Sequence, residues 1–178
     1  MTRHPPASGA TPGVTGRLQG APVVRAARPW RVGARTVRAA VDVLLRMTMA
    51  AGLAVDAAVH AQLAPLYAGI RASVSEGQLF ELEAGLACLA ALAVLAWPAR
   101  LRPPRRLVVA AAMVVAATAF AALLVSRYVD LGAIGPFPNL YEPAWFSDKT
   151  LAATGELVAL AAGIPLFLLT PRRKAPHA

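Results

Sequence analysis

Four long apolar segments dominate this sequence and restrict its possible folds more than any other feature. They run from about residues 39 to 63, 76 to 97, 107 to 129 and 148 to 170. Each is long enough, at 1.5 Å per helical residue, to cross a hydrocarbon core about 30 Å thick. Because backbone polar groups inside a bilayer must be paired within the protein, segments of this kind are expected to be helical. The sequence therefore predicts an all-α fold, an integral membrane four-helix bundle that contacts the lipid bilayer.

Prolines and capping residues predict where these helices begin and end. Pro65 and Pro98 are expected to stop the first and second helices. Ser75 and Gln78 have the spacing of a capping box at the start of the second helix. Ser147 is the expected N-cap of the fourth helix.

The two ends of the chain lack the apolar pattern of the bundle. Residues 1–37 are rich in Pro, Gly, Ala and Arg, and they predict a disordered basic tail without a cleavable signal peptide. Residues 172–178 predict a second, short basic tail. The bundle itself is expected to occupy residues 38–171.

Basic residues are concentrated on one side of the predicted membrane. Seven arginines precede residue 39, four lie between the second and third segments, and three basic residues follow the fourth, so fourteen of the 18 lie there. The positive-inside rule then predicts that both termini are cytoplasmic. Heavy use of Ala, Arg, Gly and Pro is typical of high-GC bacteria, which indicates the bacterial inner (plasma) membrane. The net charge of +9 is explained by this orientation, and no nucleic-acid binding is expected.

The ionisable residues of the first segment all fall on one helical stripe. At 100° per residue, the stripe covers about 80° of arc. A charge that faces lipid costs at least about 2.5 kcal/mol, so the stripe is expected to face the interior of the bundle. Its members are Asp42, Arg46, Met49, Leu53, Asp56 and His60. Asp42 and Arg46 are spaced to form an ion pair with each other.

Carboxyl groups from three helices are predicted to meet in one layer of the outer leaflet. Counted from the outer helix ends, the acids and the histidine of this layer lie about 5–12 Å deep. They are Asp56, His60, Glu81, Glu83 and Glu156. Arg127, near the outer end of the third helix, is the nearest counter-charge and is expected at the rim.

Glu81 and Glu83 cannot both face the same centre, because they point about 160° apart on a helix. Glu81 shares its face with Gly85 and Cys88, small residues suited to close helix contact. We therefore expect Glu81 to face inward, and Glu83 to replace it if the second helix is rotated.

The outer loop from Tyr128 to Thr150 combines glycines and prolines with aromatic residues. The glycines and prolines exclude a regular helix. The aromatic side chains fit the membrane interface. Alternatively, the loop is a lid over the mouth of the bundle, with Tyr141, Glu142 and Trp145 near the acidic layer.

The acidic layer allows several functions. It is either a structural polar network in a small non-enzymatic bundle, or a centre that handles protons, a cation, a quinone or another small ligand with a polar head. A metal site from Asp56, His60, Glu81 and Glu156 would have one histidine and lack the Glu-x-x-His repeats of di-iron bundles, so no metal is predicted. Neither a cofactor nor a catalytic motif is recognisable, and an enzyme is the weaker hypothesis. A membrane protein partner or a second copy of the chain is possible.

Three stretches, AVDAAVHAQLAPLYA, GQLFELEAG and RYVDLGAIGPFPNLYEPAWFSDKTLAA, resemble a group of small four-helix integral membrane proteins common in actinobacteria. The resemblance spans about residues 41 to 168. It implies a membrane location and four helices, and it supplies no activity. A fainter likeness is to the DoxX-like four-helix membrane proteins, some of them linked to quinone or thiol redox chemistry. The chain departs from the thiol type, because it has a single cysteine and no CxxC motif.

Overall fold

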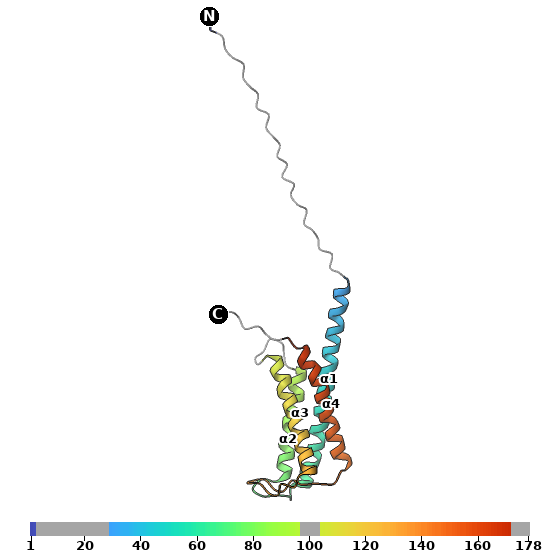
Figure 1. The fold of residues 1–178 in the computed structure, drawn as a ribbon, viewed down its shortest axis with the longest axis vertical. Coiled ribbons are helices and arrows are strands. Elements are labelled where there is room, and N and C mark those ends of the chain that lie inside the picture. The colour runs from blue at the N-terminus through green and yellow to red at the C-terminus, as the bar shows by residue number, and fades with distance from the viewer. Residues whose placement is uncertain (3–28, 97–103, 172–178) are drawn as a thin grey trace.

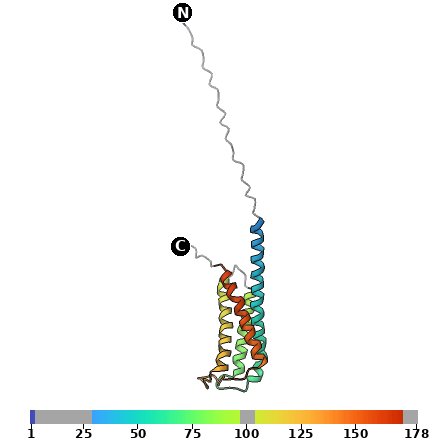
Figure 2. The same cartoon turned by 45° about the vertical axis from the view of Figure 1, so that its right-hand side comes forward.

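The computed structural model describes residues 1–2, 29–96 and 104–171, with side chains from residue 35 onward in the first helix. Four helices make up the described fold: α1 (Pro29–Tyr67), α2 (Glu76–Ala96), α3 (Arg105–Tyr128) and α4 (Ser147–Leu169). They lie lengthwise beside one another as a bundle (Figures 1 and 2). The described residues form no strand, only two isolated bridges in the loops. The predicted all-α four-helix bundle is confirmed, and each helix is long and apolar enough to cross a membrane.

The first helix is longer at both ends than the sequence predicts. It begins at Pro29, so the prediction that residues 29–37 are disordered is wrong. Proline is favoured in the first turn of a helix, where its missing N–H has no partner to lose. The helix also continues through Pro65 to Tyr67, because a proline in the last turn removes only one backbone hydrogen bond. The remaining tail residues, 3–28 and 172–178, lie outside the described residues.

One of the two predicted caps is present. The Gln78 backbone N–H donates to Ser75 Oγ (3.1 Å), and the Ser75 N–H donates to Gln78 Oε1 (2.9 Å), which confirms the capping box. The prediction for Ser147 is wrong. Ser147 is the first residue of α4, and Phe146 is the N-cap, without a side-chain hydrogen bond to the helix.

The helices are packed unequally around the bundle. Helix α1 packs closely against α2 and α4, while α2 and α3 make the loosest of the neighbouring contacts. The core is built largely from small side chains, which let helix backbones approach closely. Its members from the four helices include Met49, Leu53, Ala87, Ala91, Ala112, Ala116, Ala159 and Ala162. The space at the loose α2–α3 contact contributes to the candidate site described below.

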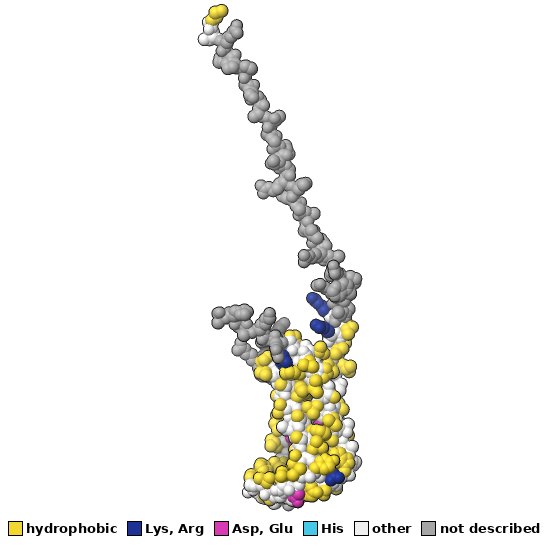
Figure 3. Space-filling view, viewed as in Figure 1, with side chains coloured by type: hydrophobic (Ala, Val, Ile, Leu, Met, Phe, Trp, Pro, Cys, Tyr) yellow, Lys and Arg dark blue, Asp and Glu magenta, His cyan; other side chains and the backbone are white. Residues whose placement is uncertain are grey.

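Large apolar side chains cover the outside of the bundle. On α2, five leucines are exposed: Leu82, Leu86, Leu89, Leu92 and Leu95. Figure 3 shows the apolar surface along the length of the bundle, with basic residues towards the end where α1 enters, and both an acidic and a basic patch towards the opposite end. A surface of this kind is stable in contact with lipid, so the chain has the surface of a multi-pass membrane protein.

The polar stripe of α1 faces the interior, as predicted. Met49, Leu53 and Asp56 are buried, and Asp42, Arg46 and His60 are partly buried. Asp42 pairs with Arg46 as expected, with 3.3 Å between Oδ2 and Nε. The structure adds a second partner, since Arg105 at the start of α3 donates from Nη2 to Asp42 Oδ1 over 2.6 Å. This pair ties α1 to α3.

Candidate functional site

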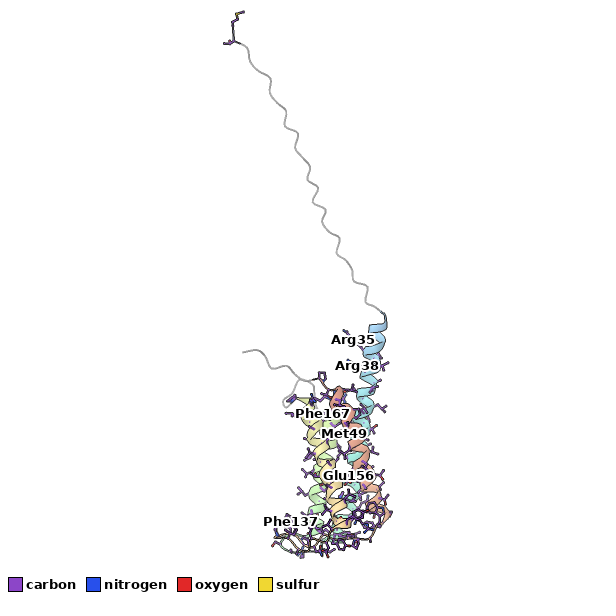
Figure 4. The ribbon with its side chains drawn as sticks, viewed as in Figure 1. Arg35, Arg38, Met49, Phe137, Glu156 and Phe167 are labelled. Atoms are coloured by element: carbon purple, nitrogen blue, oxygen red, sulfur yellow. The ribbon has the colours of Figure 1, made fainter. Side chains whose placement is uncertain are left out.

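Three ionisable side chains meet in the interior, and we call Asp56, His60 and Glu156 the acidic cluster. Asp56 and Glu156 are 0% and 1% exposed. His60 Nδ1 lies 3.1 Å from the carbonyl oxygen of Asp56 and 2.9 Å from its carboxyl Oδ1. The carboxyl groups of Glu156 and Asp56 interact electrostatically with each other. Helices α1 and α4 therefore bring their carboxyl groups together in the interior, as predicted, and Figure 4 shows Glu156 at a level of the bundle between Met49 and the loop that carries Phe137.

The acidic cluster contains few hydrogen-bond donors. Apart from the His60 contact, no N–H or O–H donor in the described residues bonds to the carboxyl oxygens of Asp56 or Glu156. A hydrogen bond between the two carboxyl groups requires a proton on one of them. Buried polar atoms without partners are rare in native proteins, which makes this cluster a candidate functional group.

Helix α2 contributes Glu83 to the site in place of Glu81, and the expectation for Glu81 is wrong. Glu81 is exposed together with Gly85 and Cys88, whereas Glu83 is partly buried and interacts electrostatically with Asp56 and His60. The rotation of α2 follows from its contacts with α1. Gly77 lies directly against the α1 backbone at Ala64.

Phe80 holds the same face of α2 against α1. Its ring packs edge-on against His60 and Tyr67, with ring centroids 5.3 Å and 5.0 Å apart. Residues three apart on a helix share a face, so Phe80 in this position directs Glu83 towards the acidic cluster.

A cavity of about 310 Å³ lies beside the acidic cluster and reaches the outer loop. Side chains from all four helices line it, and most of them are apolar. The apolar lining includes Leu63, Leu79, Phe80, Leu82, Leu86, Ala119, Ala122, Leu123, Leu140, Phe146 and Ala152. The polar lining is His60, Tyr67, Glu76, Glu83, Ser126, Glu142 and Lys149. An apolar cavity with a few polar groups is the usual form of a small-molecule site.

The outer loop closes one end of the cavity with alternate residues. Leu140, Glu142 and Phe146 line the cavity, while Tyr141 and Trp145 are exposed. Of the three residues expected in a lid, Glu142 lines the cavity, at its loop end rather than beside the acidic cluster, and Tyr141 and Trp145 do not line it. The exposed positions of those two rings fit the alternative, in which they lie at the membrane interface.

Hydrogen bonds fix the position of this loop. The Glu142 N–H donates to the carbonyl oxygen of Ser126 in α3 (2.9 Å), and the Val74 N–H donates to the carbonyl oxygen of Pro136 (2.9 Å). Asp130 Oδ1 accepts from the Gly132 N–H and from Asn139 Nδ2, both at 3.0 Å. The loop is thus an ordered wall of the cavity.

Two basic residues lie at the loop end of the cavity, and only one of them was expected. Arg127, the expected rim residue, lies over the Tyr128 ring at 5.2 Å and interacts electrostatically with Lys149. Lys149 is buried, and its Nζ donates to the carbonyl oxygen of Glu142 over 2.8 Å. The sequence signal for Lys149 was its place in the first turn of α4, directly after the loop.

The cavity and the acidic cluster are the main guides to function. In the described residues, no group of three or more His, Cys, Asp or Glu side chains is arranged to hold a metal ion. The chain matches no protein-family model, and searches of curated proteins and of solved structures also find no match. The resemblance to actinobacterial four-helix proteins stays a prediction.

Proposed function

We propose that this chain is a non-enzymatic protein of the bacterial plasma membrane that binds a small amphiphilic molecule in its outer-leaflet cavity. The observation that carries the proposal is the 310 Å³ cavity, which joins an apolar wall to polar groups at His60 and Glu83. An amphiphile would place its apolar body against the leucines and its polar head towards these two residues. This arrangement satisfies both kinds of surface at once.

The position of the cavity supports entry from the lipid. Leu82 and Leu86 line the cavity and are also 60% and 43% exposed on the outside of α2. The opening therefore lies at the loose contact between α2 and α3. A molecule dissolved in the bilayer could enter there without crossing the water phase.

A cavity-filling substitution tests the proposal. The variant Leu86→Trp places a larger ring in the cavity wall, and Leu89→Trp is its control on the same helix, because Leu89 is 65% exposed and does not line the cavity. The probe is the uncharged fluorescent amphiphile N-octyl dansylamide, titrated into protein in phosphatidylcholine nanodiscs. We expect saturable binding to the native chain and to Leu89→Trp, and at least tenfold weaker binding to Leu86→Trp. Absence of saturable binding, or equal affinities in both variants, would contradict the proposal.

A further inference from the structure

We propose that the cavity selects amphiphilic cations, with an organic ammonium head bound against Glu83. This inference rests on the proposed function, because it names the ligand class that the same cavity would take. It follows from the distribution of charge at two depths of the cavity.

The loop end of the cavity has charges of both signs. Glu76 and Glu142 lie there with Lys149, whose Nζ is held by the Glu142 carbonyl oxygen and lies 5.4 Å from the centre of the Phe146 ring. Arg127 interacts with Lys149 from the end of α3. Lys149 therefore offsets part of the negative charge of the acids at this end.

The deeper part of the cavity is acidic. Glu83 lies seven residues into α2 from Glu76, which places it about 10 Å further from the loop end. Its Oε1 is buried and accepts no hydrogen bond from the described residues. Besides Lys149 at the loop end, the described lining contains no Lys or Arg.

The acidic cluster borders Glu83 at this depth. Asp56 interacts electrostatically with Glu83, and Glu156 interacts with both. His60 is the one titratable base among them, and its Nδ1 is already placed against Asp56. Charges act strongly on one another in a site with little water, so the Glu83 carboxylate at this end of the cavity favours a positive ligand group.

The Phe80 ring, one turn from Glu83, favours an organic cation over an inorganic one. Phe80 lies three residues before Glu83 and lines the cavity, and the Tyr67 ring, nearer the loop end, packs against Phe80 with 5.0 Å between centroids. An ammonium group is attracted to the face of such rings as well as to a carboxylate. A small inorganic cation would instead need several oxygen ligands, whereas the wall around Glu83 consists mainly of leucine, alanine and phenylalanine.

The test compares two ligands that differ only in charge. The probes are (4-phenylbutyl)trimethylammonium and its carbon isostere, in which a tert-butyl group replaces the ammonium head. Affinities are measured by calorimetry with protein in phosphatidylcholine nanodiscs, and empty nanodiscs give the background of partitioning into lipid. The variants are Glu83→Gln and, as the matched control two residues away, the exposed Glu81→Gln.

We expect the native chain and Glu81→Gln to bind the cation at least tenfold more tightly than the isostere. Glu83→Gln should lose this preference and still bind the isostere, which also shows that the variant is folded. Equal binding of both probes to the native chain, or a preference that survives in Glu83→Gln, would overturn the inference and leave the proposed function standing. Absence of binding by either probe would overturn both.

Discussion

Asp56 and Glu156 lie side by side in the interior because the backbones of α1 and α4 touch beside them, at Gly52 and Gly155. A Cβ atom on Gly155 would lie 2.7 Å from the carbonyl oxygen of Gly52, and one on Gly52 would lie 2.8 Å from the Ala159 nitrogen. Gly52 is one helical turn before Asp56, and Gly155 is adjacent to Glu156. The close crossing of two small-residue positions therefore brings the two carboxyl groups together.

Substitution of Gly52 should separate α1 from α4. We expect Gly52→Ala to lower the free energy of unfolding by about 1–3 kcal/mol, because the added methyl group meets backbone atoms that cannot move aside. The measurement is reversible unfolding in mixed micelles with increasing dodecyl sulfate. Gly85→Ala is the control, since a Cβ there would meet nothing within 4 Å, and it should be neutral or slightly stabilising. Equal stability of the two variants would refute the close crossing.

Glu156 should tolerate an amide better than a methyl group. In Glu156→Gln, the new side-chain N–H₂ can donate to the Asp56 carboxyl oxygens, which have few donors now, so stability should change by less than about 1 kcal/mol. Glu156→Ala leaves those oxygens without this neighbour and creates a hole, at an expected loss of about 2–4 kcal/mol. Unfolding of both variants in the same micelles provides the comparison.

The Gln variant also separates two roles of the acidic cluster. A purely structural network needs only hydrogen bonds, so Glu156→Gln should then bind amphiphiles with native affinity. A cluster that contributes charge to the cavity should instead bind the phenylbutyl ammonium probe more weakly in this variant. If Glu156→Gln loses as much stability as Glu156→Ala, the Asp56 carboxyl oxygens do not lack hydrogen-bond donors in the native chain.

Periodic features of the sequence predicted the fold and one wall of the site. Segment length predicts the four helices. The ionisable stripe predicts which face of α1 points inward, because charged side chains in an apolar membrane segment face the interior of the bundle. The rotation of α2 did not follow from the same reasoning. That helix is apolar on nearly every side, and its two central acids point in opposite directions.

A different signal in α2 would have given the correct rotation. Five of its six leucines are exposed, whereas Gly77, Ala87 and Ala91 are buried in the bundle. In lipid, leucine has no preference for the interior, whereas small residues allow close packing. The packed face is therefore marked by small residues, and Glu83 lies towards that face.

The cavity could not have been predicted from any single segment. It depends on the loose contact between α2 and α3 and on the course of the loop that ends in Glu142 and Phe146. The loop is held by backbone hydrogen bonds to residues far away in the sequence, such as that from Val74 to Pro136. Because these hydrogen bonds join backbone atoms, they produce no recognisable side-chain pattern in the sequence.

The ion pair between Asp42 and Arg105 should couple α1 to α3 modestly. Both side chains are partly exposed, so we expect a coupling free energy of about 0.5–1 kcal/mol in a double-mutant cycle of Asp42→Asn and Arg105→Gln. The charge-exchanged double variant, Asp42→Arg with Arg105→Asp, should be more stable than either of its single variants. The opposite order of stabilities would show that the contact contributes through packing alone.

The orientation of the bundle is predicted by charge and can be tested by reporter fusions. The structure places the start of α1 and the end of α4 at the same end of the bundle, and the loop with Phe137 at the other (Figures 1 and 4). Because basic residues are concentrated at the first end of the bundle, we expect it to be cytoplasmic. Alkaline phosphatase should be active when fused after Gly135 and inactive after Arg102 or Ala178, and green fluorescent protein should show the reverse. Phosphatase activity after Ala178 would show that the bundle has the opposite orientation, with the cavity in the inner leaflet.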